Sequence, residues 1–200
     1  MSNIQQIKPV ISGVPGSGNK LVSFLKTGFV VDADLNKEIF NFSRVDSRAN
    51  AKFLTNLDDA GRIGNSLDFE ACTIGVRMIK IGATAPTVQE LHDMKKYLAS
   101  LEIKVKVGSD DKPAGDFTGL QFTDPQEFSA IGGSGATLSG VVNPSSQKGE
   151  VNLPVPVLIQ RGWEIKGEVK STLSAVPSTL REASEEWVVE IFLVGFKQTY

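Results

Sequence analysis

Alternation of apolar and polar residues with a period of two is the feature of this sequence that most constrains its fold. Three segments show it: 101–107 (LEIKVKV), 163–170 (WEIKGEVK) and 186–194 (EWVVEIFLV). Successive side chains of a β-strand point to opposite faces of a sheet, so each segment can cover a core with one face. Further strands are expected at 21–25, 29–31, 38–43, 69–81 and 151–159. The pattern predicts an all-β chain of about eight antiparallel strands, arranged as a sandwich.

Two of these segments carry signals for their position within a sheet. The strand at 187–194 is apolar on both faces except at Glu190, which predicts a central strand covered from two sides. A helix such as 87–99 or a neighbouring subunit could supply the second cover. By contrast, Pro154 and Pro156 have no N–H group to donate, so their strand is expected at the edge of a sheet or to begin irregularly.

One or two short helices are expected as insertions between the strands. Helix formers dominate between 46 and 57, where Asp46 or Ser47 could cap a short helix. A clearer helix is predicted at 87–99, because Thr87 and Glu90 form a capping box. Its apolar positions fall along or beside one helical face: Val88, Leu91, Met94, Tyr97 and Leu98.

The domain organisation follows from the stretches that lack such patterns. Residues 1–19 are predicted to form a flexible N-terminal arm, and 20–200 a single sandwich domain. The stretch 108–150 is rich in Gly, Ser, Asp and Pro, which indicates long surface loops. Short apolar patches are expected to anchor these loops: Phe117, Leu120, Phe122, Phe128, Leu138 and Val141.

Composition excludes several classes of protein. The 21 Lys and Arg nearly balance the 23 Asp and Glu, which argues against a general binder of nucleic acid or of membrane surfaces. The N-terminus lacks the pattern of a signal peptide, and no apolar run approaches the ~20 residues that span a bilayer. Cys72 is the single cysteine, so it forms no disulfide within the chain, and its apolar context predicts a small buried core residue.

Several short motifs resemble known phosphate- or metal-binding sites but lack the residue spacing that those sites require. The segment 13–20 (GVPGSGNK) resembles a phosphate-binding loop, but Asn19 separates the last Gly from the Lys and no Ser or Thr follows. Asp58–Asp59 and Asp110–Asp111 are adjacent, whereas calcium loops space their ligands, so turns explain them better. Glu185–Glu186 is expected in a solvated turn before the last strand.

A catalytic centre is not predicted. His92 is the single histidine and sits in the predicted helix without a second ligand or a nucleophile beside it. The stretch 132–135 (GGSG) lacks the strand and helix of a nucleophile elbow. Aromatic residues that could stack on a sugar are few: Trp163, Trp187, Tyr97 and Tyr200. Both tryptophans lie in alternating strands, which favours packing in the core. We therefore predict no enzyme, cofactor or metal.

A set of segments between residues 50 and 197 carries a resemblance to a known family. They are 53–64 (FLTNLDDAGRIG), the strand start at 67–69, the strand 101–107, the Gly-rich stretch 132–149, the segment 153–159 (LPVPVLI) leading into 163–166, and 193–196 (LVGF). Their order is similar to that in the coat proteins of tailless icosahedral bacteriophages with a jelly-roll fold. The match lies in spacing and hydrophobic pattern, without a catalytic signature. The helix 87–99 and the arm 1–19 have no specific counterpart in it.

The resemblance implies an eight-stranded jelly-roll sandwich that builds an icosahedral capsid. Copies would associate, as trimers or capsomers, with each other and with other capsid proteins, and would contact a packaged genome or an internal membrane. No small-molecule substrate is implied. The location would be the virion, after synthesis in the host cytoplasm. Long loops and an N-terminal arm suit such assembly, because shells need many modest interfaces.

Two other classes of function remain open on the sequence. A receptor- or carbohydrate-binding β-sandwich, such as a virion spike, would place exposed aromatics in its loops, where Phe117, Phe122 and Phe128 are the candidates. A sandwich-fold hydrolase with two carboxylates that lie far apart along the chain is the third alternative.

Overall fold

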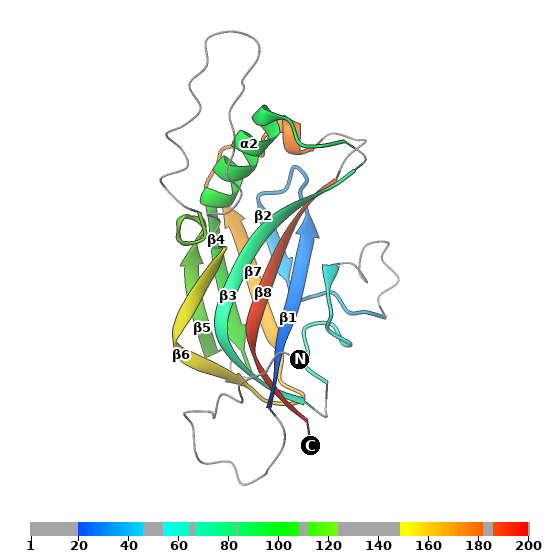
Figure 1. Ribbon diagram of the computed structural model, residues 1–200, viewed down its shortest axis with the longest axis vertical. Helices are drawn as coiled ribbons and strands as arrows, with labels where there is room; N and C mark the ends of the chain where they lie inside the picture. Colours follow the sequence, from blue (N-terminus) through cyan, green and yellow to red (C-terminus); the bar gives the residue numbers. More distant parts are fainter. Residues whose placement is uncertain are drawn as a thin grey trace, which may run out of the picture.

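The computed structural model describes residues 20–45, 54–64, 67–82, 84–108, 112–123, 149–181 and 186–199. These residues form two four-stranded sheets and one α-helix (Figure 1). The predicted N-terminal arm, most of the predicted helix at 46–57 and most of the predicted loops between 108 and 150 lie outside the described residues.

The first sheet has the strand order β1-β8-β3-β6, with bounds β1 Lys20–Val30, β8 Glu186–Thr199, β3 Leu67–Ile81 and β6 Glu150–Ile159. The second has the order β2-β7-β4-β5, with bounds β2 Asn36–Ile39, β7 Ile165–Ser171, β4 Leu101–Val107 and β5 Lys112–Thr118. Every named strand pair is antiparallel. The predicted all-β sandwich is therefore confirmed.

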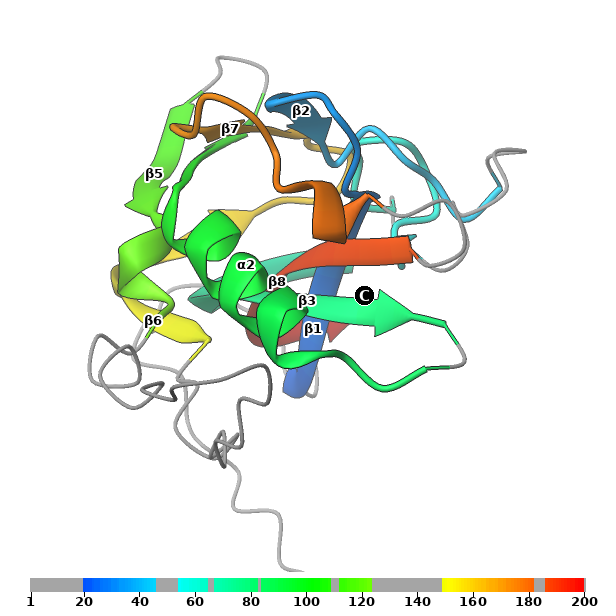
Figure 2. The ribbon, with the colours of Figure 1, turned by 90° about the horizontal axis from the view of Figure 1, so that it is seen from above.

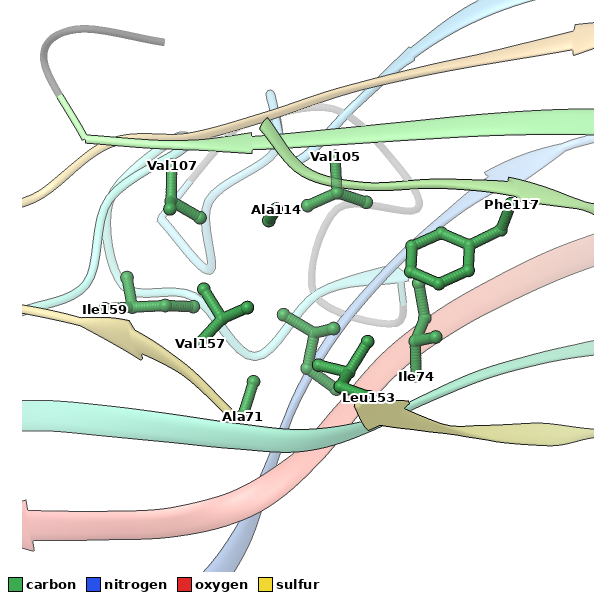
Figure 3. Close-up of a pocket in the computed structure, with 10 residues that line it drawn as sticks. Ala71, Ile74, Val105, Val107, Ala114, Phe117, Leu153, Val157 and Ile159 are labelled. Atoms are coloured by element: carbon green, nitrogen blue, oxygen red, sulfur yellow. The ribbon is translucent and has the colours of Figure 1, made fainter. Parts of the chain in front are cut away.

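The core lies between the two sheets because each sheet turns its alternating apolar residues inward. In Figure 3, Ala71, Ile74, Leu153, Val157 and Ile159 of the first sheet face Val105, Val107, Ala114 and Phe117 of the second. The space between them is a cavity of only about 10 Å³, about the least that one water molecule needs. Side chains thus fill the interior between the sheets.

Both positional signals in the strands are confirmed. Strand β8 pairs with β1 on one side and β3 on the other, so it is central in its sheet. Strand β6, which contains Pro154 and Pro156, is the last strand of the same sheet. Strand β4 alternates buried and exposed residues along its whole length, as its period of two predicts.

The predicted capping box begins the helix α2, Val88–Ala99, which lies between β3 and β4 in the chain. Thr87 Oγ1 accepts a hydrogen bond from Glu90 N at 3.2 Å, and Glu90 Oε2 accepts one from Thr87 N at 2.6 Å. Seen from above, the helix crosses one end of the sandwich (Figure 2). Two short 3-10 helices, η1 Gly119–Gln121 and η4 Ser178–Leu180, lie against it.

Several sequence predictions were wrong in detail. The stretch 112–118, expected as loop, is the strand β5, whose Pro and Gly residues are accommodated at the edge of the second sheet. The strand expected at 38–43 ends at Ile39, because Phe40 adopts a φ of 64°, which breaks the extended backbone. Segments 21–25 and 29–31 belong largely to one continuous strand. Glu186 begins β8 and is not part of a turn.

Candidate interaction surface

The outer face of the first sheet carries exposed apolar side chains. On β1, Val22 pairs with Phe196 of β8 and Phe24 pairs with Val194. Their neighbours Leu25 and Leu193 are buried in the core, so strand alternation directs this set to the opposite side of the sheet. Val22 is 69% exposed and Phe24 52%.

The same set extends across the sheet. Glu70 of β3 pairs with Phe196 on one side and with Leu158 of β6 on the other, so Leu158 joins the row that begins at Val22. Leu158 is 45% exposed. We call the set Val22, Phe24, Leu158, Val194 and Phe196 the apolar face. Glu70 interrupts the row between Phe196 and Leu158, so the continuous part of the apolar face lies on β1 and β8. Exposed apolar patches on a protein surface can mark interaction sites.

At the other end of the same outer surface, β8 is covered by the chain itself. Val188 and Glu190 are almost fully buried. Leu54 lies over Gly28 of β1. Its Cδ2 atom is 3.5 Å from the point that a Cβ atom added to Gly28 would occupy. The predicted second cover of β8 is thus supplied, at this end, by a segment outside the helix. The apolar face begins where that cover stops.

Glu190 anchors an ion cluster under this cover. Lys26 Nζ lies 3.0 Å from Glu190 Oε2, and Arg77 Nε donates to Glu190 Oε1 at 2.8 Å. The Arg77 guanidinium also lies 5.5 Å from the ring centroid of Phe192. That ring lies across Gly75, where any side chain would collide with it. Two cations thus compensate the carboxylate that β8 buries, and the Phe192 ring contacts one of these cations.

Both edges of the first sheet carry features that resist pairing with another strand. Asn56 covers part of the β1 edge, because its Oδ1 accepts from Lys26 N at 2.7 Å and its Nδ2 donates to Phe24 O at 2.8 Å. The β6 edge has two prolines, Pro154 and Pro156, that cannot donate to a neighbouring strand. A partner would therefore meet the face of this sheet more readily than its edges.

The outer face of the second sheet is charged instead. Its strands carry acidic and basic residues in equal number, and we call this set the charged face: Glu38, Glu102, Lys104, Lys106, Asp116, Lys166, Glu168 and Lys170. All eight are exposed. Beside it, hydrogen bonds from Arg62 and Lys166 lower the pKa of Glu164. This face is well hydrated and balanced in charge.

The helix end of the sandwich contains the strongest shift in pKa. Burial alone would raise the pKa of Glu90, but bonds from Lys80 and from the Thr87 backbone and side chain lower it to about 2. Lys80 Nζ lies 2.7 Å from Glu90 Oε1 and 5.9 Å from the ring centroid of Trp187. This ion pair ties α2 to β3. Burial, with the negative charge of Asp32, raises the pKa of Tyr97 to about 12.

The candidate chemical groups are not brought together among the described residues. His92 is exposed on α2, with Nδ1 3.6 Å from Asp93 Oδ1. Asp58 and Asp59 are exposed, and Asp58 Oδ1 lies 3.5 Å from Arg44. No group of three or more metal-ligating side chains occurs in the described ranges. The segments 13–19, 110–111 and 132–135 lie outside them.

Cys72 corrects a prediction. It is half-buried and not a core residue, because a register shift between Ala71 and Thr73 makes it the extra residue of a β-bulge. Its Sγ lies 3.8 Å from Glu70 O.

The aromatic residues considered for sugar binding serve packing. Trp187 and Tyr97 are 2% and 1% exposed, so the prediction of core packing is confirmed for Trp187. Trp163 is partly buried against the core. Phe117 lies in strand β5 and not in a loop, and it packs beside the buried Phe122 with ring centroids 6.2 Å apart. Leu120, also expected to anchor a loop, is 64% exposed, so that prediction was wrong. Tyr200 and Phe128 lie outside the described residues.

Sequence reasoning found that 187–194 is apolar on both sides, but it did not find the apolar face as a whole, because Val22, Phe24 and Leu158 lie in other segments. Its signal was the apolar character of neighbouring residues in 21–25 and 191–196, which leaves no polar side for water. Within the described chain, no helix combines the length and apolar character that crossing a membrane requires. No protein family, curated protein or solved structure matched this chain in the comparisons.

Proposed function

We propose that this chain is a structural coat protein of an icosahedral virus particle, which acts by associating with copies of itself. The observation that carries the proposal is the apolar face. Val22, Phe24 and Leu158 are exposed on strands of a regular sheet, and contact with a partner in an assembly would bury them. Its partners would be further copies, as trimers or capsomers, and other capsid proteins. Contact with a packaged genome or an internal membrane belongs to the same proposal.

The strand pairing supports a jelly roll as the finer description of the sandwich. Strand β1 pairs with β8, β2 with β7, β3 with β6 and β4 with β5. A long antiparallel hairpin that rolls up on itself produces this order, and the jelly roll is one architecture used in viral capsids. Because jelly rolls also serve unrelated functions, the argument for assembly rests on the surface and not on the fold.

The contrast between the two outer faces supports an oriented arrangement in a shell. One face carries the exposed apolar set together with a few charged residues, and the other carries mixed charges that water solvates well. A subunit of this kind can bury the first against a neighbour while the second stays in water. Near-balanced charge, with 21 basic and 23 acidic residues, keeps repulsion between copies small.

The test is the mass of the purified chain across a range of concentrations, measured by light scattering, with electron micrographs of the same samples. We expect trimers, sheets or shells. Phe24→Asp should shift the population towards monomers, and the matched variant Lys104→Asp on the charged face should leave it unchanged. A monodisperse monomer at every concentration would contradict the proposal, and retention on a glycan column would favour a binding module.

A further inference from the structure

The outer face of the second sheet contains a hollow beside the end of β2. Residues from all four strands of the sheet and from the segment 60–62 line this hollow, which has a volume of about 1190 Å³. Nine of the lining residues are charged, so an occupant would be polar or charged and not apolar. We call it the charged hollow. It opens on the face that the proposed assembly leaves in water, where a small solute can reach it.

The register of the strands places like charges opposite each other inside the charged hollow. Lys106 of β4 pairs with Lys166 of β7, and Glu38 of β2 pairs with Glu168 of β7. Like charges directly opposite each other on neighbouring strands destabilise a sheet. A bound group of opposite charge at each pair would relieve this repulsion.

The like-charge pairs are local to the hollow. Outside it, the same sheet pairs Glu102 with Lys170, which is the attractive combination. Lys104 has an acidic partner on each neighbouring strand. Lys106 lacks such compensation, because its partner on β5 is Pro113 and it makes no ion pair with any residue that the structure describes. The uncompensated charge therefore lies where the surface is concave.

Arg62 adds a third cation at the positive end of the hollow. Its Nη2 donates to Glu164 Oε1 at 2.7 Å, and Lys166 Nζ lies 3.4 Å from Glu164 Oε2. A guanidinium has five N–H donors, so this bond leaves others for a second acceptor. Gly61, with a φ of 66°, holds the segment in place because its O accepts from Ile165 N at 2.6 Å. Three cations and one carboxylate line this end, which favours an oxyanion such as phosphate.

We propose that the charged hollow binds a small zwitterion of the phosphoethanolamine type, with a phosphate at one end and an ammonium at the other. The phosphate would lie against Arg62, Lys106 and Lys166. The ammonium would lie against Glu38 and Glu168, whose carboxylates accept its hydrogen bonds. This inference goes beyond the proposed function and does not depend on self-association.

The spacing of the two like-charge pairs suits a small ligand. Neighbouring strands lie ~4.8 Å apart and alternate residues of one strand ~6.6 Å apart, so the centres of the two pairs are separated by about 8 Å. A two-carbon linker between phosphate and amine, together with the reach of the side chains, spans this separation. A polyanion such as nucleic acid fits less well, because its further phosphates would meet the acidic pair.

Titration calorimetry of the full chain with O-phosphoethanolamine tests the proposal, with inorganic phosphate and ethanolamine as probes of the two halves. We expect saturable binding of the zwitterion, tighter than that of either half. Lys106→Ala should weaken it about 3–5-fold. Glu38→Gln should weaken it about 2–4-fold and leave the affinity for inorganic phosphate unchanged or higher. The matched variants Lys170→Ala and Glu102→Gln, from the attractive pair outside the hollow, should change neither affinity.

A second experiment distinguishes the two sources of this chemistry. Vesicles of phosphatidylcholine are sedimented with the protein, with and without phosphatidylethanolamine. Sedimentation that rises with the phosphatidylethanolamine content would identify a lipid headgroup as the ligand. Binding of the soluble ester alone would identify a free phosphate ester.

Three results would overturn the proposal, and none of them bears on self-association. The first is absence of saturable binding. The second is equal affinity for phosphate and phosphoethanolamine with no effect of Glu38→Gln, since the hollow would then hold a plain anion. The third is equal weakening by Lys106→Ala and Lys170→Ala. All substituted positions are exposed, so the variants should fold, and Lys106→Ala should keep or raise the thermal midpoint because it removes a repulsion.

Discussion

The outer faces of the two sheets lie over similar cores but differ in what they present. Strand β4 alternates buried Ile103 and Val105 with exposed Lys104 and Lys106. Strand β8 alternates buried Leu193 with the outward apolar residues Val194 and Phe196. The core requires only the inward half of each alternation. The outward residues are not constrained by the core, so their composition indicates what each face contacts. The outer face of the second sheet contacts water, and we propose that the outer face of the first sheet contacts another copy.

The two sheets also place their ion pairs differently. Glu190 of the first sheet is 3% exposed and bonded to Lys26 and Arg77, and Glu90 of α2, which pairs with Lys80 of the same sheet, is 5% exposed. On the second sheet, Glu164 pairs with Arg62 at 2.7 Å at an exposed position. Exposed pairs contribute little to stability, whereas breaking a buried one leaves charges without compensation. The four predictions below compare the two regions.

The largest effect is expected at the core. Trp187→Ala should lower the free energy of unfolding by about 3–5 kcal/mol, because the ring is fully buried between β8 and the helix end. Chemical denaturation measures it, with Trp163→Ala as the control of smaller effect, since that ring is only partly buried. A change below ~1 kcal/mol would mean that this end of the first sheet is turned towards solvent.

The next effect compares one carboxylate from each outer face. Glu190→Ala should cost about 2–4 kcal/mol, because it removes the ion pairs that this buried carboxylate makes with Lys26 and Arg77. Glu168→Ala on the charged face should stay within about 0.5 kcal/mol. Equal costs at the two positions would remove the distinction between a buried and a solvated set of charges.

Lowering the pH should weaken the buried ion pair of Glu90 more than the exposed ion pair of Glu164. The pKa of Glu90 falls from an ordinary 4.5 to about 2 on folding, so its stabilising contribution is complete above about pH 5 and disappears as the pH falls towards 2. We expect about 1–3 kcal/mol of acid-dependent stability from this group. Glu90→Gln should flatten the pH profile of unfolding, and Glu164→Gln, at the exposed pair, should leave it nearly unchanged. A larger effect of Glu164→Gln than of Glu90→Gln on the pH profile would contradict the assignment of the acid-dependent stability to Glu90.

The smallest change in stability, and the most direct test of the faces, comes from Phe24→Asp. At 52% exposure this position should tolerate the substitution with less than about 1 kcal/mol of change, while the apparent dissociation constant for self-association rises at least ~10-fold. Lys104→Asp is the control on the charged face. Thermal melts and sedimentation measure the two quantities, and equal weakening by both variants would show that the apolar face has no special role.

Local signals in the sequence predicted much of the fold. Alternation at 101–107 predicted a half-buried strand, the prolines at 154 and 156 an edge strand, and Thr87 with Glu90 the start of the helix, and all three are confirmed. Strand β5 was missed because its Pro and Gly residues resemble a loop, and only pairing with β4 holds it extended. Cys72 was misassigned because a bulge depends on the register of two neighbouring strands.

The sequence by itself determined most of the strands and, along the regularly alternating ones, which residues face the core, because the period of two follows from backbone geometry. The tertiary structure alone decided which strands are neighbours. Pairing of β1 with β8 places Val22 and Phe24 from one end of the chain beside Phe196 and Val194 from the other. Each residue alone is an ordinary exposed apolar side chain. The candidate surface exists only because long-range hydrogen bonding between strands gathers them on one face.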